Sequence, residues 1–86
     1  MQKFTYIITD PLGIHARPAG ILAKAAKTYP ETTIMIAKGD NAVKATQLMK
    51  LMSLGVKEGD TITVTAEGPT EVEAIDVMFN TFEDYL

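Results

Sequence analysis

The sequence predicts a single α+β domain in which three helices cover one face of a four-stranded antiparallel sheet, in the order βαββαβα. Three patterns predict this class. The short turn Gly39-Asp40-Asn41 joins two apolar segments, so these segments form an antiparallel pair. Residues 61–66 alternate strictly between threonine and apolar side chains, as a strand with one solvated face does. Apolar residues recur at helical spacing after Ala16 and after Thr70. We therefore expect a two-layer, open-faced β-sandwich.

The first strand and the first helix follow from local composition. Residues 4–9 are rich in β-branched and aromatic side chains and predict a strand. Asp10-Pro11-Leu12-Gly13 is typical of a turn. The alanine-rich residues 16–28 predict a helix with Pro18 in its first turn, where the missing N–H costs nothing. Tyr29-Pro30 ends that helix.

The remaining elements are shorter, apart from the last helix. Residues 33–37 and 42–45 predict the second and third strands, and residues 47–54 predict a short helix that Gly55 ends. Thr70-Glu71-Val72-Glu73 matches a capping box and marks the start of the last helix. The expected apolar face of that helix consists of Ile75, Met78, Phe79 and Phe82.

Length and composition limit the possible functions. The 86 residues form one domain, residues 1–86, and contain no cysteine for a disulfide or a thiolate metal site. A net charge of −3 gives no reason to expect nucleic acid as a partner. No apolar run approaches membrane-spanning length and the first residues do not resemble a signal peptide, so we expect a cytoplasmic protein. A domain of this size rarely builds a deep substrate pocket, so any chemistry should lie on its surface.

His15 is the only histidine and the main candidate for that chemistry. A lone histidine is more often a surface or capping residue without a function. Here, however, Gly13-Ile14-His15 leads from a turn directly into a helix, which places His15 at the N-cap or next to it. The first N–H groups of a helix have no internal partners, and the helix dipole adds partial positive charge. Together they form an anion site whose usual occupant is phosphate.

Arg17 strengthens this interpretation, although alone it would be an ordinary solvated residue. Its guanidinium offers a fork of donors that matches phosphate oxygens. Positive charge near His15 favours the neutral imidazole, whose free ring nitrogen can attack phosphorus. Other chemistry has weaker support, because the only serine, Ser53, lies within an apolar helix and only Asp10 is close to His15 as a metal ligand. We expect no metal and no cofactor.

The segment Gly13-Ile14-His15-Ala16-Arg17-Pro18-Ala19 resembles the active-site signature of HPr, the histidine-containing phosphocarrier of the bacterial phosphoenolpyruvate:sugar phosphotransferase system. Chain length, element order, Leu51-Met52-Ser53-Leu54-Gly55 and Ala66-Glu67-Gly68 match as well. The resemblance implies phosphorylation of His15 on Nδ1, with Arg17 binding the phosphate and Ala16 and Pro18 forming the helix start.

The partners that the resemblance implies are enzyme I as donor and the enzyme IIA domains of sugar permeases as acceptors. The protein would then be a carrier within a relay rather than a stand-alone enzyme. A regulatory module that binds partners without phosphoryl flux is the alternative.

Two further surfaces follow from the resemblance. Many HPr proteins carry a regulatory serine at the start of the middle helix, and that position falls on Gln47 or, with a different placement of one extra residue, on Thr46. An HPr kinase/phosphorylase and a catabolite-control regulator are therefore doubtful partners.

The expected docking patch lies beside the histidine. It comprises Leu48, Met49, Met52 and Gly55 with the charged contacts Lys24 and Lys27. By sequence alone, these apolar residues could equally be core, and the lysines an ordinary solvated face.

Overall fold

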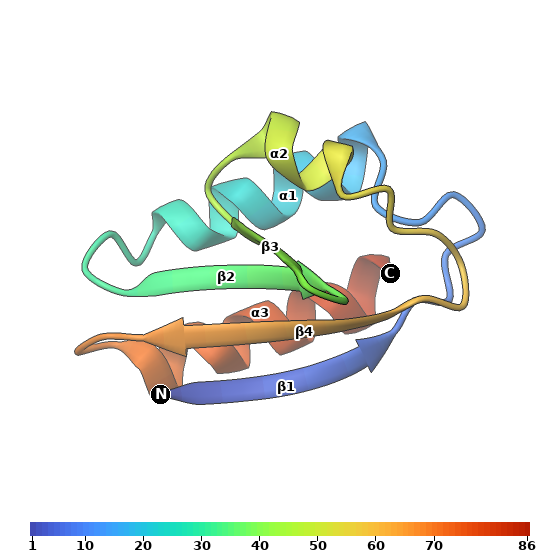
Figure 1. The fold of residues 1–86 in the computed structure, drawn as a ribbon. Coiled ribbons are helices and arrows are strands. Elements are labelled where there is room, and N and C mark those ends of the chain that lie inside the picture. The colour runs from blue at the N-terminus through green and yellow to red at the C-terminus, as the bar shows by residue number, and fades with distance from the viewer.

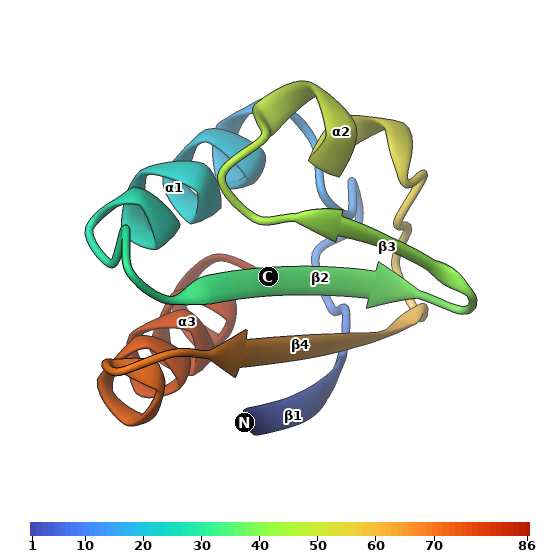
Figure 2. The ribbon, with the colours of Figure 1, turned by 60° about the vertical axis from the view of Figure 1, so that its left-hand side comes forward.

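The computed structural model describes residues 1–86 and has the predicted element order. The strands are β1 (Gln2–Ile7), β2 (Thr33–Lys38), β3 (Asn41–Lys44) and β4 (Thr61–Glu67). The helices are α1 (Ala16–Lys27), α2 (Leu48–Ser53) and α3 (Glu71–Tyr85). The strand order is β1-β4-β2-β3 and every neighbouring pair is antiparallel. All three helices lie on one side of this sheet (Figures 1 and 2), so the predicted two-layer fold is confirmed.

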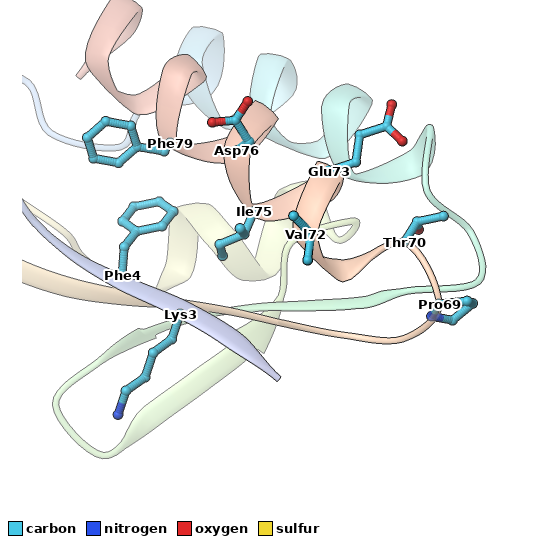
Figure 3. Close-up of a pocket in the computed structure, with 9 residues that line it drawn as sticks. All are labelled: Lys3, Phe4, Pro69, Thr70, Val72, Glu73, Ile75, Asp76 and Phe79. Carbon is cyan, nitrogen blue, oxygen red and sulfur yellow. The ribbon is translucent and has the colours of Figure 1, made fainter.

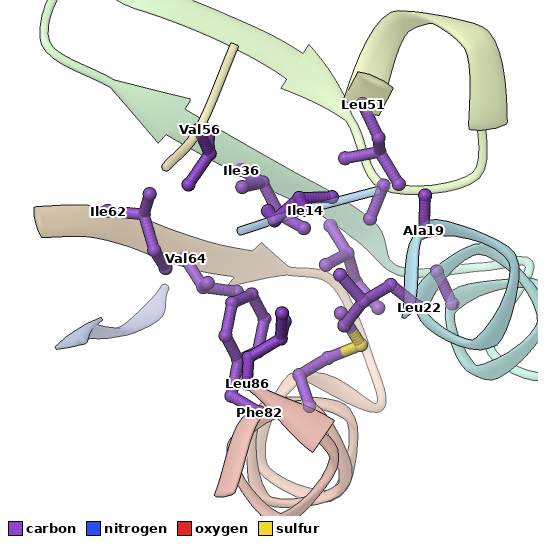
Figure 4. Packing of buried hydrophobic residues seen from close by; sticks show 14 of the residues in the cluster. Ile14, Ala19, Leu22, Ile36, Leu51, Val56, Ile62, Val64, Phe82 and Leu86 are labelled. Carbon is purple, nitrogen blue, oxygen red and sulfur yellow. The ribbon is translucent and has the colours of Figure 1, made fainter. Parts of the chain in front are cut away.

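The core lies between the sheet and the helices (Figure 4). The alternation in β4 buries Ile62 and Val64 completely, while the threonines between them face away from the core. From the helices, Leu22, Leu51 and Phe82 fill the space opposite. One continuous apolar layer therefore holds the helices in place, as expected for a chain without disulfides.

β1 ends at Ile7, two residues before the predicted end at Thr9, because the next backbone groups bond elsewhere. The N–H of Ile8 donates to the carbonyl of Asp60 at 3.0 Å. The N–H groups of Thr9 and Asp10 donate to the carbonyl of Leu86 at 2.7 and 3.0 Å, and the Thr9 hydroxyl donates to the same oxygen at 2.8 Å. The segment that leads to His15 is thus tied to the residue that follows α3.

The predicted capping box at the start of α3 is wrong. Thr70 is the N-cap residue, but its hydroxyl bonds to the hydroxyl of Thr32 at 2.6 Å instead of capping the helix. Glu71, not Glu73, reaches back, and accepts the N–H of Gly68 at 3.2 Å. The Glu71 carboxylate also lies 2.8 Å from the N-terminal ammonium, and this hydrogen-bonded contact lowers the pKa of Glu71. A distant partner, Thr32, therefore competes successfully with the local cap.

The largest cavity lies between β1 and the first half of α3 and has a volume of about 680 Å³ (Figure 3). Phe4, Ile75 and Phe79 are among its apolar lining residues, and Lys3 and Glu73 are among its polar ones. Phe79, expected on the buried face of the last helix, is 37% exposed because it lines this cavity. His15 does not line it, so the largest cavity is not the place of the candidate chemistry.

Lys38 ties the end of β2 to the segment between α2 and β4. Its ammonium donates to the carbonyl of Gly55 at 2.8 Å and lies 2.9 Å from a carboxylate oxygen of Asp60. The hydrogen bond from Lys38, together with one from the Lys57 N–H, lowers the pKa of Asp60. Charge pairing therefore helps to fix the loop that follows α2.

Replacing Asp60 with asparagine is expected to flatten the acid side of the stability profile. A carboxyl whose pKa is lowered by folding stabilises the fold above its ordinary pKa of 3.8, and this contribution disappears as the pH falls through the folded value. Urea unfolding between about pH 5 and about pH 2 should show a smaller loss of free energy for Asp60→Asn than for the wild type. Lys38→Met should reproduce part of the effect, because the Lys57 N–H still donates to Asp60. Identical pH profiles for all three proteins would contradict the role of this pair.

Candidate phosphoryl site

The turn before α1 is pinned against the loop after α2. Gly13 has a φ of +65°, and a Cβ at this position would lie 2.1 Å from the carbonyl oxygen of Val56. The same oxygen accepts the N–H of Ile14 at 3.2 Å, and the Ile14 side chain is buried. Only glycine combines this backbone conformation with such a close approach. The turn therefore fixes the position of His15, which follows Ile14 in the chain.

His15 is the N-cap residue of α1, as the sequence predicts. Its backbone is extended, with φ −103° and ψ −174°, and its carbonyl accepts the N–H of Ala19 at 2.9 Å. The imidazole makes no capping hydrogen bond, and its side chain is 36% exposed. The ring is thus neither buried in the apolar interior nor used to stabilise the helix.

Backbone and side-chain donors surround the start of α1. The N–H groups of Ala16 and Arg17 have no hydrogen-bond acceptor within the protein, and Pro18 has no N–H. The Arg17 guanidinium is exposed and forms no ion pair. Two amides and one guanidinium are therefore available to an anion next to His15.

The histidine lies in a shallow cavity of about 340 Å³ that distant parts of the chain complete. His15, Arg17 and Pro18 form one side, while Asp84 and Tyr85 come from the end of α3. By sequence alone, the acidic residues of the last helix are a solvated face without a role (Glu71, Glu73, Asp76, Glu83 and Asp84). That view misses the position of Asp84, and no signal in a single sequence links it to His15.

Asp10 also lines this cavity, and a carboxylate oxygen of Asp10 lies 4.0 Å from Nε2 of His15. The same oxygen accepts the N–H of Leu12 at 2.8 Å. The electrostatics predicted from the sequence include only the positive charge of the helix start and of Arg17. They leave out the negative charge of Asp10 near the ring. The Leu12 N–H is engaged and its side chain is exposed, so the amides left for an anion are those of Ala16 and Arg17.

The apolar residues of α2 divide between core and surface. Leu51 is fully buried, whereas Leu48, Met49 and Met52 are 39%, 74% and 38% exposed. These three residues lie on the helix that packs next to α1 (Figure 1). Leu12, close to His15 in the chain, is another exposed apolar residue that the sequence interpretation did not include. An uncovered apolar surface thus extends over α2.

The other expected contacts are exposed as well. Lys24 and Lys27 lie in the last turn of α1, and Gly55 follows α2 with a φ of +68°. Gln47 is the N-cap residue of α2 and is exposed, whereas Thr46 is half-buried. The start of the middle helix therefore presents an amide side chain rather than a hydroxyl.

No three His, Asp or Glu side chains are grouped where they could hold a metal ion. None of the helices is both long and apolar enough to cross a membrane.

Comparison with known proteins identifies the family of this chain. A family model described as the PTS HPr component phosphorylation site matches residues 2–84. The chain is 41% identical over 75 residues to the phosphocarrier protein HPr of Mycoplasma genitalium, covering 87% of this chain and 85% of the relative. A solved Mycoplasma histidine-containing phosphocarrier superimposes with a TM-score of 0.93 at 36% identity, with 96% and 93% of the two chains covered.

A second solved structure, HPr of Thermoanaerobacter tengcongensis, superimposes with a TM-score of 0.91 at 34% identity, covering 98% of this chain and 93% of that one. The fold and these similarities together define a protein of the phosphocarrier class. The chain belongs to the HPr family of the phosphotransferase system.

Proposed function

We propose that the protein accepts a phosphoryl group on Nδ1 of His15 from phosphorylated enzyme I and donates it to enzyme IIA domains of sugar permeases. One observation carries the proposal: an exposed imidazole at the N-cap of α1 lies beside two amides without acceptors and an unpaired guanidinium. Family membership supplies the class of reaction.

Phosphoryl transfer needs only one covalent bond to the protein, the bond between Nδ1 and phosphorus. The lone pair of Nδ1 forms a bond to phosphorus as the bond between phosphorus and the donor breaks. The N–H groups of Ala16 and Arg17 and the Arg17 guanidinium stabilise the charge on the phosphoryl oxygens. Catalysis of in-line transfer consists mainly of positioning and charge stabilisation, and both are needed again when the group leaves.

The open surroundings of His15 favour a carrier over a stand-alone enzyme. The cavity is shallow, so the rest of the site must come from the partner that brings or takes the phosphoryl group. The proposed partners place this exchange in the cytoplasm, and it requires no cofactor bound to this chain.

The assay is incubation of the protein with enzyme I and phosphoenolpyruvate. We expect one phosphoryl group that is stable in base, labile in acid and located by peptide mass spectrometry on His15. If a competent enzyme I that labels a known HPr leaves this protein unmodified, the carrier function is wrong and a regulatory binding module is favoured.

We further propose that the docking patch consists of Leu48, Met49, Met52 and Gly55, with Lys24 and Lys27 as charged contacts. Exposure of the three apolar side chains supports it, because exposed apolar surface on a folded domain is typical of a partner interface. Methionine adapts its shape readily, which suits a protein with several partners.

Substitutions in the two parts of the surface should separate binding from chemistry. With enzyme I, Arg17→Ala is expected to lower kcat about 100-fold, because it removes charge stabilisation during transfer. Met49→Glu is expected to raise KM about tenfold with kcat nearly unchanged, because it places a charge in the apolar contact. Val72→Glu, at a similarly exposed apolar position on α3, is the matched control and should leave both constants unchanged. A normal kcat for Arg17→Ala would remove the guanidinium from the site.

In the favoured alignment the regulatory position falls on Gln47, which lacks a phosphorylatable oxygen, and in the alternative alignment it falls on Thr46, which is half-buried. We therefore propose that phosphorylation at the start of α2 is absent. An HPr kinase/phosphorylase and a catabolite-control regulator are then not partners of this chain through that position.

A further inference from the structure

We propose that Asp10 is a positioning residue that holds the proton of His15 on Nε2 and thereby leaves Nδ1 free to accept the phosphoryl group. This inference rests on the proposed function, but its central claim concerns the ring of the free protein. Carboxylate, turn and imidazole form one unit at the start of α1.

The Asp10 carboxylate is held in place by its own turn. Oδ1 accepts the N–H of Leu12 at 2.8 Å. The Asp10 carbonyl accepts the N–H of Gly13 at 3.0 Å, and its N–H donates to the carbonyl of Leu86 at 3.0 Å. Contacts of its side chain and of its backbone thus fix Asp10. Its carboxylate is therefore held in one orientation before any partner binds.

The fixed carboxylate faces one particular nitrogen of the ring. Oδ1 of Asp10 lies 4.0 Å from Nε2 of His15. This distance is longer than a hydrogen bond, but Asp10 has the only carboxylate within 4.0 Å of a ring nitrogen, and contacts of this kind often shorten when the reaction complex forms. No other hydrogen bond or ion pair holds the imidazole. Arg17, Asp84 and Tyr85 share the cavity without forming an ion pair with the ring.

A carboxylate can only accept a hydrogen bond, so it selects one tautomer. A neutral imidazole carries one N–H and one lone pair, and the partner of one nitrogen decides which atom has the proton. With Asp10 beside Nε2, the proton stays on Nε2 and the lone pair resides on Nδ1. Asp10 therefore prepares the same nitrogen that the proposed function uses.

The same contact assists both directions of transfer. When Nδ1 forms its bond to phosphorus, the donor departs with the electrons of the broken bond, and the ring keeps its Nε2 proton and gains positive charge. The Asp10 carboxylate stabilises this charge. On delivery, the N–P bond breaks and its electrons return to Nδ1. Because Nε2 is still protonated, the leaving group is neutral imidazole rather than an imidazolate anion.

Three substitutions separate the turn from the ring contact. Asp10→Ala removes both the hydrogen bond to the Leu12 N–H and the contact with the ring. Asp10→Ser keeps an oxygen that accepts the Leu12 N–H but is too short to reach the ring. Asp10→Asn keeps a neutral oxygen that can serve both contacts. If Asp10 acts through the ring, serine should behave like alanine, and asparagine should restore the tautomer preference without restoring the negative charge.

The first readout is the ¹⁵N spectrum of His15 at a pH where the ring is neutral, which needs no partner protein. We expect a predominant Nε2–H tautomer in the wild type and Asp10→Asn, and a mixture with Nδ1–H in Asp10→Ser and Asp10→Ala. The second is transfer from phosphorylated enzyme I, where kcat should fall about tenfold in the serine and alanine variants with KM unchanged.

A serine variant with the wild-type tautomer and kcat would overturn the proposal and reduce Asp10 to a turn-forming residue. The two levels of inference fail separately. Absence of phosphorylation in the wild type with the expected tautomer pattern would refute the carrier function alone, whereas normal phosphorylation with unchanged tautomers would refute only the role of Asp10.

Discussion

The His15→Asn variant is expected to lose phosphorylation completely while its fold becomes more stable than that of the wild type. The amide nitrogen of asparagine is not a nucleophile, so no phosphoryl group can be accepted at this position. Asparagine is, however, one of the best N-cap residues, and its side-chain oxygen can accept the Arg17 N–H that lacks an acceptor in this structure. A gain of about 1 kcal/mol in the free energy of unfolding is expected.

His15→Ala is the matched control because it removes the nucleophile without supplying a cap. Both variants should fail to take up acid-labile phosphate from enzyme I and phosphoenolpyruvate. Urea unfolding should rank His15→Asn above His15→Ala by about 1 kcal/mol. Equal stabilities would show that the amides at the start of α1 are not available, and the anion site would lose its physical basis.

His15→Asn is expected to abolish phosphorylation and to raise stability. These opposite effects explain why a weak cap occurs at this helix start. His15 leaves the N–H groups of Ala16 and Arg17 without acceptors, which is unfavourable for the helix. Under the proposed function, the same N–H groups stabilise the phosphoryl group. The weak cap then gives up stability in exchange for function, as is common at functional positions.

The fold could be predicted largely because its signals are local. The alternation in residues 61–66, the turn at Gly39-Asp40-Asn41 and the alanine-rich residues 16–28 each determine one element within a short window. The placement of His15 at a helix start followed from Gly13 and Pro18 on either side of it. Local patterning left the apolar residues of α2 equally compatible with core and surface, and only the family resemblance favoured an exposed Met49.

Contacts between distant residues could not be predicted in this way. The Leu86 carbonyl holds the segment before His15, and Asp84 reaches the cavity of the histidine from the far end of the chain. The hydroxyl pair of Thr32 and Thr70 displaces the predicted capping box across 38 positions. One sequence carries no information on which remote side chains meet, so the electrostatics of the ring were only partly foreseen.

Gly13→Ala is expected to cause the largest loss of stability of any single methyl addition at the site. The new Cβ would meet the Val56 carbonyl oxygen at 2.1 Å and the Lys57 Cα at 2.8 Å, and both are backbone atoms that cannot rotate away. Positive φ adds strain for a residue with a Cβ. Urea unfolding should show a loss of about 3 kcal/mol, combining roughly 1 kcal/mol of conformational strain with the cost of separating two packed loops.

Gly39→Ala isolates the two contributions, because Gly39 has a similar φ of +60° but no neighbouring atom within 4 Å of the position that a Cβ would occupy. This control should lose only about 1 kcal/mol. In Gly13→Ala the displaced loop also moves His15 relative to the amides of α1, so the rate of phosphorylation by enzyme I should fall, whereas Gly39→Ala should transfer normally. If the two variants lost equal stability, the close approach of Gly13 to Val56 would not determine the position of the histidine, and the geometry of the site would need another origin.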